Sequence, residues 1–348
     1  MIVDQNTSLE AAMTLYCGID LHSNNHVICV INDKDKRLFE AKLDNDPTLT
    51  LGALKRYKKR LKGVAIESTF NWYWLADALI AEGYHVDLVN TAKVIQYSGL
   101  KRTNDHYDAF HLAHLMRLGI LPIGHIYPKA DRGLRDLMRK RIQLVQDRSS
   151  HIIRLKSQFQ AHTGQILKTQ AIKTQRFQLP VAGDDNVQLM WRAHLNMIRA
   201  LSVQITALEK VIMVQVTNSR PFQLLKTVTG IGDILAETIL LETGPISRFK
   251  SPGNYASYCR CVDSRRESNG KKKGENNRKN GNRYLAWAFI EAATFAMSKS
   301  QKAKRFYQKK CKASNTIVAR KALAHKLARA CYWIMKNEVP YNEDRLFA

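Results

Sequence analysis

Apolar residues follow two different periods along this chain. In its N-terminal part, short runs rich in Val and Ile predict strands at 15–20, 26–31, 62–67 and 85–90. Apolar residues at helical spacing predict helices at 47–61, at 72–82 and after residue 104. The first two strands fit an antiparallel pair, and the alternation of strands with helices indicates a mixed sheet with helices on its faces.

The rest of the chain has mainly the helical period. Apolar residues recur every three, four or seven positions over 131–159 and 190–212, with the polar stretch 163–186 between them. This pattern predicts a long helical hairpin that serves self-association, or an ordinary helical pair inside a larger core. Further helices are predicted at 284–297 and 302–336, and Cys259 and Cys261 are expected on a strand.

Composition narrows the class of protein. The 348 residues suffice for two or three domains, and 55 Lys and Arg against 30 Asp and Glu give a charge of +25, which indicates a nucleic-acid partner. Six cysteines without C-x-x-C spacing indicate neither a zinc finger nor a disulfide scaffold. The N-terminus has no leader pattern and no apolar run reaches about 18 residues, so we expect a cytoplasmic protein without a membrane span.

Four carboxylates lie at element ends. Asp20 and Glu67 are the last residues of predicted strands, and Asp105 and Asp108 share one face of the first turn of a helix. Each can be explained as a helix cap or a dipole partner, but together they suggest a site for Mg²⁺ or Mn²⁺, because hard cations prefer oxygen ligands. His111 and His114 continue the same helical face, where core or supporting roles are favoured over metal ligation.

Basic and glycine-rich segments are candidate nucleic-acid contacts. Lys101 and Arg102 precede Asp105, and the backbone amides of Gly230 and Gly232 lie between two helical stretches, as in helix-hairpin-helix motifs. The stretch 264–283 predicts a positively charged loop suited to binding a phosphate backbone, or alternatively a solvated charged surface. Its basic candidates are Arg265, Arg266, Lys271, Lys272, Lys273, Arg278, Lys279 and Arg283.

A serine in this loop is a candidate nucleophile. A serine hydroxyl becomes a good nucleophile only where a base, a metal or a positive pocket stabilises its alkoxide, and the neighbouring cations could supply the last of these. Both Ser264 and Ser268 meet this description. Physical reasoning on the residues alone does not choose between them.

Ordered motifs in both halves resemble a known family. They are Tyr16–Asp20, Ala65–Thr69 and Gly99–Ala109, followed by Thr229–Gly232, Phe249–Tyr258, Ser268–Gly270, Gly274 and Lys279–Leu285. Over roughly 14–340 the chain resembles the bridge-RNA-guided insertion-sequence transposases, relatives of the Piv DNA invertase. The family pattern usually has Ser directly before Gly, Pro before Gly-Ile-Gly, and Ser or Thr before the later Lys. Asn269, Thr229 and Arg278 depart from it here.

The resemblance implies an α/β RuvC/RNase H-like DEDD domain at 14–128, a coiled-coil helical hairpin at 129–216 and a mostly helical transposase domain at 217–340. It implies that Asp20, Glu67, Asp105 and Asp108 hold Mg²⁺ and that Ser268, with Ser264 as second candidate, attacks DNA to form a phosphoserine. Expected partners are donor and target DNA, a structured bridge RNA and further copies of the chain, acting at the nucleoid. The rivals are a junction-resolving nuclease that uses water and a non-catalytic DNA- or RNA-bridging protein.

Overall fold

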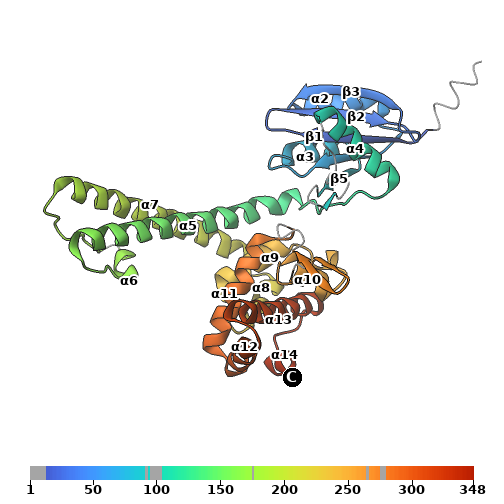
Figure 1. Cartoon of the computed structure of the whole chain (residues 1–348). Coiled ribbons are helices and arrows are strands. Elements are labelled where there is room, and N and C mark those ends of the chain that lie inside the picture. The colour runs from blue at the N-terminus through green and yellow to red at the C-terminus, as the bar shows by residue number, and fades with distance from the viewer. Residues whose placement is uncertain (1–12, 91–92, 95–103, 175, 264–265, 275–279) are drawn as a thin grey trace, which may run out of the picture. The chain divides into compact units, whose positions relative to one another are not determined.

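The computed structural model describes residues 13–90, 93–94, 104–174, 176–263, 266–274 and 280–348. Its internal contacts divide the chain into two units, 1–129 and 130–348, and each is described by itself (Figure 1). No helix in the described ranges is long and apolar enough to cross a membrane.

The first unit is built on a five-stranded mixed sheet with the strand order β3-β2-β1-β4-β5. Its strands are β1 (Leu15–Leu21), β2 (Asn25–Ile31), β3 (Arg37–Asp44), β4 (Leu61–Glu67) and β5 (Val86–Val89). The first three run antiparallel to one another, whereas β4 pairs parallel with β1 and β5 parallel with β4. The predicted α/β sheet of RuvC/RNase H-like type is confirmed.

Helices cover both faces of this sheet, as Figure 1 shows. They are α2 (Pro47–Leu54), the short 3-10 helix η1 (Lys55–Tyr57), α3 (Tyr73–Ala81) and α4 (Asp105–Leu118). α2 and α3 pack on one face through Leu54 and Leu75, and α4 packs on the other through Leu112 and Leu115. Because both faces are covered, the central strand β1 is buried along its whole length.

Gly18 is where α4 comes closest to the sheet. A Cβ atom on Gly18 would lie 2.0 Å from the carbonyl oxygen of Ala109 and 2.7 Å from the amide nitrogen of Ala113. Since no side chain fits in that space, the absence of one lets the helix backbone rest directly on β1. Asp20 lies two residues further along the strand, on the same face as Gly18.

Two elements of the first unit differ from the sequence prediction. The strand β3 was not predicted, because most of its residues are exposed or half-buried and its apolar residues form no uninterrupted run. The helix expected over 47–61 ends at Leu54 and continues only as the short helix η1, since the chain enters β4 at Leu61.

The second unit begins with a long helical hairpin, as predicted. It consists of α5 (Lys129–Thr163) and α7 (Asp185–Val216), with the single turn α6 (Thr169–Ile172) in their connection (Figure 1). At the connection end, Leu155 and Phe159 of α5 pack with Trp191 and Leu195 of α7. At the other end, both helices join the core of the helices that follow.

The remaining helices form one core around α11 and α13. In chain order they are α8 (Arg220–Lys226), α9 (Asp233–Thr243), the 3-10 helix η4 (Ile246–Arg248), α10 (Pro252–Tyr258), α11 (Arg283–Lys299), α12 (Gln301–Ala313), α13 (Thr316–Asn337) and α14 (Glu343–Phe347). Tyr255, Phe289 and Tyr332 are fully buried at its centre. The predicted mostly helical C-terminal domain, with paired helices around Gly230-Ile231-Gly232, is confirmed.

Two expectations for this domain are wrong. Cys259 and Cys261 are not on a strand: α10 ends at Tyr258, and Arg260 (φ 55°) turns the chain while Cys261 N–H donates to the carbonyl of Ala256. The helix expected over 302–336 is two helices, α12 and α13. It breaks because Asn315 caps α13, its side chain accepting a hydrogen bond from Val318 N–H.

Candidate functional site

Two parallel strands bring Asp20 and Glu67 to the same edge of the sheet. Ile19 of β1 pairs with Ile66 of β4, and each is followed by its acidic residue. Side chains alternate along a strand, so the two acids lie on the same face. Asp20 is 3% exposed, whereas Glu67 is half-buried.

The first turn of α4 brings Asp105 and Asp108 to this face. The cap of the helix is Asn104, whose side chain accepts a hydrogen bond from Tyr107 N–H. Asp105 and Asp108 therefore do not serve as the N-cap, although acidic groups in the first turn still benefit from the helix dipole. Helix capping was the simplest alternative explanation for the two aspartates, but in the structure Asn104 has that role.

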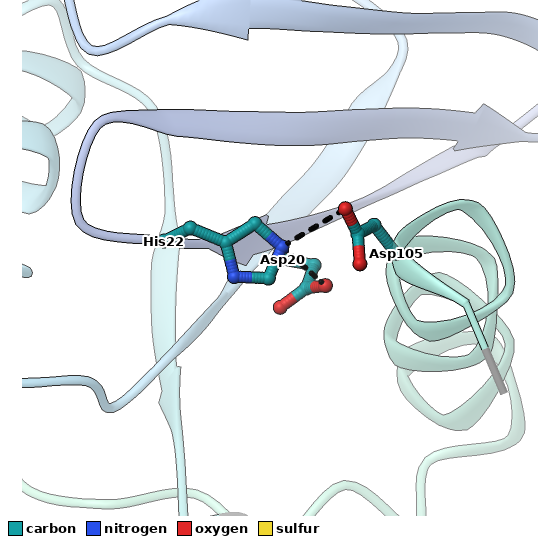
Figure 2. A group of neighbouring side chains, drawn as sticks. All are labelled: Asp20, His22 and Asp105. Atoms are coloured by element: carbon teal, nitrogen blue, oxygen red, sulfur yellow. Dashed lines mark ion pairs between the residues drawn. The ribbon is translucent and has the colours of Figure 1, made fainter.

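A histidine that sequence reasoning missed joins the two segments. The Nε2 atom of His22 lies 3.3 Å from Asp20 Oδ2 and 3.4 Å from Asp105 Oδ2, as Figure 2 shows. His22 follows Asp20 by two residues, so the alternation of side chains puts both on one side of the chain. That D-x-H spacing was the available signal for His22.

The carboxyl group of Asp108 is partly buried and lies near the charges of Asp20 and Asp105. Its Oδ1 atom is buried and has no hydrogen-bond partner among the described residues. Burial raises the pKa of Asp108, and the charges of Asp20 and Asp105 raise it further, while His22 acts in the opposite direction. Lys42 Nζ, 3.5 Å from Asp105 Oδ2, offsets part of the charge.

These residues fit a divalent cation. Asp20, His22 and Asp105 each offer one ligand atom, and these three atoms lie within 4.8 Å of one another. Three crowded carboxylates with an orphaned buried oxygen form an environment that a divalent ion would stabilise. The structure does not bring Glu67 into that three-residue group, although it ends its strand at the same edge.

His111 and His114 lie further along α4. Burial lowers the pKa of His111, and the neighbouring His114 adds to this effect. His114 Nδ1 lies 2.8 Å from Asp35 Oδ1, and Arg117 donates to both oxygens of Asp35 at 2.6 Å. These contacts tie α4 to the turn after β2, a supporting role that agrees with the preference stated from the sequence.

Ser268 belongs to a short β-hairpin in the second unit. The strands β6 (Arg266–Ser268) and β7 (Lys271–Gly274) pair antiparallel, with Ser268 opposite Lys271. Asn269 and Gly270 form the two-residue turn with φ angles of 51° and 68°, values that favour an Asn-Gly pair. The stretch expected as a loop is thus partly a hairpin, and the inserted Asn269 is a turn residue beside the exposed Ser268.

The turn between α8 and α9 gives its two glycines different surroundings. Gly230 is buried, and a Cβ atom there would lie 2.5 Å from the carbonyl oxygen of Ala292 on α11. Gly232 is exposed and is the N-cap of α9. Gly230 therefore permits close packing of the turn, while Gly232 is the glycine of the pair that is accessible from outside.

An ion pair between the half-buried Arg139 and the buried Glu242 positions the motif that follows the hairpin. Arg139 of α5 donates to both oxygens of Glu242 at 2.5 and 2.8 Å, and Glu242 accepts from the Asn282 side-chain amide at 2.6 Å. Asn282 in turn caps α11 by accepting from Tyr284 and Leu285 N–H groups. Through these contacts the hairpin helix α5 fixes the start of α11.

Only some of the other candidate nucleic-acid contacts lie within the described residues. Lys101, Arg102, Arg265, Arg278 and Lys279 lie outside the described residues, as does Ser264, and the side chains of Arg266 and Lys272 are not described. Lys271, Lys273 and Arg283 are exposed. Arg283 lines a polar cavity of about 680 Å³ between α5 and α11.

Two transposase family models match this chain, one over most of the first unit and the whole of α5 and the other within the second unit. The DEDD transposase domain of the IS110 type matches residues 17–163, and the transposase family IS116/IS110/IS902 matches residues 222–308. The search among curated proteins returned no match. The first match contains the carboxylates of the sheet edge, and the second contains Ser268.

Proposed function

Because this chain belongs to the IS110 family of transposases and is therefore a DNA transposase or recombinase, we propose that it joins DNA transiently to Ser268. The proposed reaction uses Asp20, Glu67, Asp105 and Asp108 together with this serine. The observation that carries the metal part of the proposal is the convergence of Asp20, His22 and Asp105 beside the orphaned Asp108 oxygen.

The family indicates use of a divalent metal, and we propose Mg²⁺, with Mn²⁺ as a substitute. Asp20, Asp105 and His22 would hold the ion, with Asp108 and Glu67 adjacent. When bound, such an ion supplies positive charge that stabilises a phosphoryl group in transfer. His22 would add an imidazole nitrogen to a group of carboxylate oxygens, which are the ligands that suit both Mg²⁺ and Mn²⁺.

The serine step follows from the chemistry of its hydroxyl. The Oγ atom of Ser268 attacks the scissile phosphorus, an Oγ–P bond forms, and the bond from phosphorus to one deoxyribose oxygen breaks. The hydroxyl proton passes to a carboxylate of the site, and the leaving deoxyribose oxygen takes up that proton and departs as a sugar hydroxyl, which later reverses the step on a new strand. Lys271, opposite Ser268 in the hairpin, is suited to stabilise the developing charge.

The proposal also assigns roles to the domains and names the partners. The units at 14–128, 129–216 and 217–340 would act as the DEDD domain, an oligomerisation hairpin and a serine transposase domain. We propose that a second copy associates through α5 and α7, so that carboxylates and serine meet in a composite site. We also propose a structured bridge RNA that pairs with donor and target DNA at the nucleoid, with basic side chains and Gly232 holding phosphates.

A covalent-adduct assay tests the proposal. End-labelled element DNA, its flanking RNA and Mg²⁺ are incubated with the full chain, and a protease-sensitive protein–DNA adduct is sought. The adduct should fall below detection in Ser268→Ala and in Asp105→Asn, and should persist in Ser298→Ala, a control in the same unit. Loss in Ser264→Ala with persistence in Ser268→Ala would move the nucleophile to Ser264.

Other outcomes of the assay would support one of the two alternative functions, a nuclease or a bridging protein. Cleavage without any adduct would show a nuclease that uses water. Binding without cleavage by the parent protein, unchanged in Asp20→Asn and Asp105→Asn, would leave a bridging protein whose carboxylates serve only the fold.

A further inference from the structure

A second site lies far along the chain from the carboxylates and the serine. A cavity of about 400 Å³ opens between α13 and the C-terminal segment that folds back over it. Its lining includes the basic residues Lys326, Arg329 and Arg345, the aromatic Trp333, and the amides Asn337 and Asn342. Cavities of this size commonly hold small organic groups.

The two walls of this cavity are held in place by the fold. Residues of α13 at helical spacing form one wall, and Glu338 (φ 53°) turns the chain to form the other. The returning segment is fixed because Tyr341 N–H donates to Thr227 Oγ1 at 2.9 Å and Lys326 Nζ donates to the Leu346 carbonyl at 2.6 Å. An ion pair between Lys302 and Asp344 adds a third contact.

An exposed aromatic ring faces solvent at this cavity. Trp333 is 45% exposed although it is a large apolar side chain. Its indole makes an edge contact with the buried Tyr332, with ring centroids 5.2 Å apart at 80°, and Lys336 Nζ lies over the ring at 5.7 Å from its centroid. An aromatic ring that remains accessible is suited to stacking against another flat ring.

The charged lining is entirely basic. Lys326, Arg329 and Arg345 line the cavity, and no acidic side chain does so among the described residues. Asn337 adds an amide group that can both donate and accept hydrogen bonds, and Asn342, whose side-chain oxygen already accepts from Arg345 N–H, adds an NH₂ donor. An aromatic platform, cations and amides together match the ring, the phosphate and the base edges of one nucleotide.

We propose that this cavity binds an unpaired nucleotide of the DNA substrate, with its base on Trp333 and its phosphate near Arg329 and Arg345. A base within a duplex is stacked on both faces, so only an unpaired base can offer a face to the indole. Strand exchange requires strands that have left their duplex. The inference rests on the DNA substrate of the family, and it requires neither Ser268 nor the metal.

Binding of a labelled twelve-nucleotide oligothymidylate, followed by fluorescence anisotropy in EDTA, tests this assignment. No cleavage occurs under these conditions, so the result is independent of the adduct assay. Trp333→Ala should weaken binding roughly 5- to 100-fold, since stacking contributes that much per base. Trp333→Phe should retain most of the affinity, and Arg329→Gln with Arg345→Gln should flatten its salt dependence.

Phe295→Ala provides the matched control, because Phe295 is a similarly exposed aromatic residue on α11 outside the cavity. It should bind as the parent does. An oligonucleotide of abasic sites should bind the parent and Trp333→Ala equally. Unchanged binding of oligothymidylate by a folded Trp333→Ala, an equal loss on duplex DNA, or a loss confined to oligouridylate would each overturn the assignment.

Discussion

The Nε2 atom of His22 lies 3.4 Å from Asp105 Oδ2, so the residue after β1 touches the first residue of α4. Asp20 lies at a similar distance from the same nitrogen. The cation-binding group therefore depends on how α4 sits on the sheet, and each of its three members can be tested separately.

Removing a carboxylate or the imidazole should weaken metal binding. We expect Asp105→Asn and His22→Gln each to lower the affinity for Mn²⁺ by roughly tenfold or more, because each removes one atom of the group or its support. Titration of the full chain by isothermal calorimetry measures this directly. Glu82→Gln, a surface carboxylate after α3, is the control, and equal affinities in all four proteins would contradict the site.

Adding a methyl group at Gly18 should displace α4. Its Cβ would lie 2.0 Å from the Ala109 carbonyl, so Gly18→Ala should lower the free energy of unfolding by about 1–3 kcal/mol and also weaken Mn²⁺ binding. Denaturant unfolding and the same titration provide the two measurements.

Gly52→Ala is the matched control for this change. Gly52 lies inside α2, and a Cβ there meets nothing within 4 Å. The substitution should raise the free energy of unfolding by about 0.5–1 kcal/mol, since alanine favours a helix. If Gly18→Ala behaved in the same way, the close approach of α4 to β1 would not be what positions Asp105.

Glu237 should make the helical unit less stable in mild alkali. This carboxyl group is fully buried on α9, and burial raises its pKa to about 7, while Arg141 lowers it and Asp233 and Glu209 raise it. A raised pKa means that the stabilisation is full below the unfolded value near pH 4.5 and is lost as the pH rises through about 7.

Replacing Glu237 by Gln should remove that loss. At pH 8 we expect Glu237→Gln to be more stable than the parent by up to about 3 kcal/mol, whereas near pH 4 the two should be similar. Urea unfolding at several pH values measures the difference, and Glu291→Gln on α11 controls for the loss of one charge. Parallel pH curves for the parent and Glu237→Gln would refute the role of Glu237.

The lysines after Ser268 should contribute to the salt dependence of nucleic-acid binding. Replacing Lys271, Lys272 and Lys273 by Gln should reduce the slope of log affinity against log salt by about one for each phosphate that a lysine no longer neutralises. Binding isotherms at several salt concentrations give this slope. A slope equal to that of the parent would show that these lysines are only a solvated surface.

Much of the fold could be predicted from local patterns. The buried strands β1, β2, β4 and β5 were visible because short runs composed mainly of apolar residues indicate burial on both faces, and the hairpin helices were visible because their apolar spacing persists over many turns. The edge strand β3 could not be found in this way, since its half-exposed pattern resembles a loop. Asn269-Gly270 did carry a turn signal that the interpretation as a loop overlooked.

The candidate site, like the fold, could be predicted from the sequence only in part. That Asp20 ends a strand and that Asp105 and Asp108 share a helical turn follow from the sequence alone, because strand ends and helix starts are local features. The sequence also determined the basic character of the chain and the family motifs in both halves. Only the tertiary structure decided that His22 bridges Asp20 and Asp105 and that Trp333 borders a basic cavity. Those relationships join segments distant along the chain, and their distances depend on packing, such as that of α4 against Gly18, which local patterns do not encode.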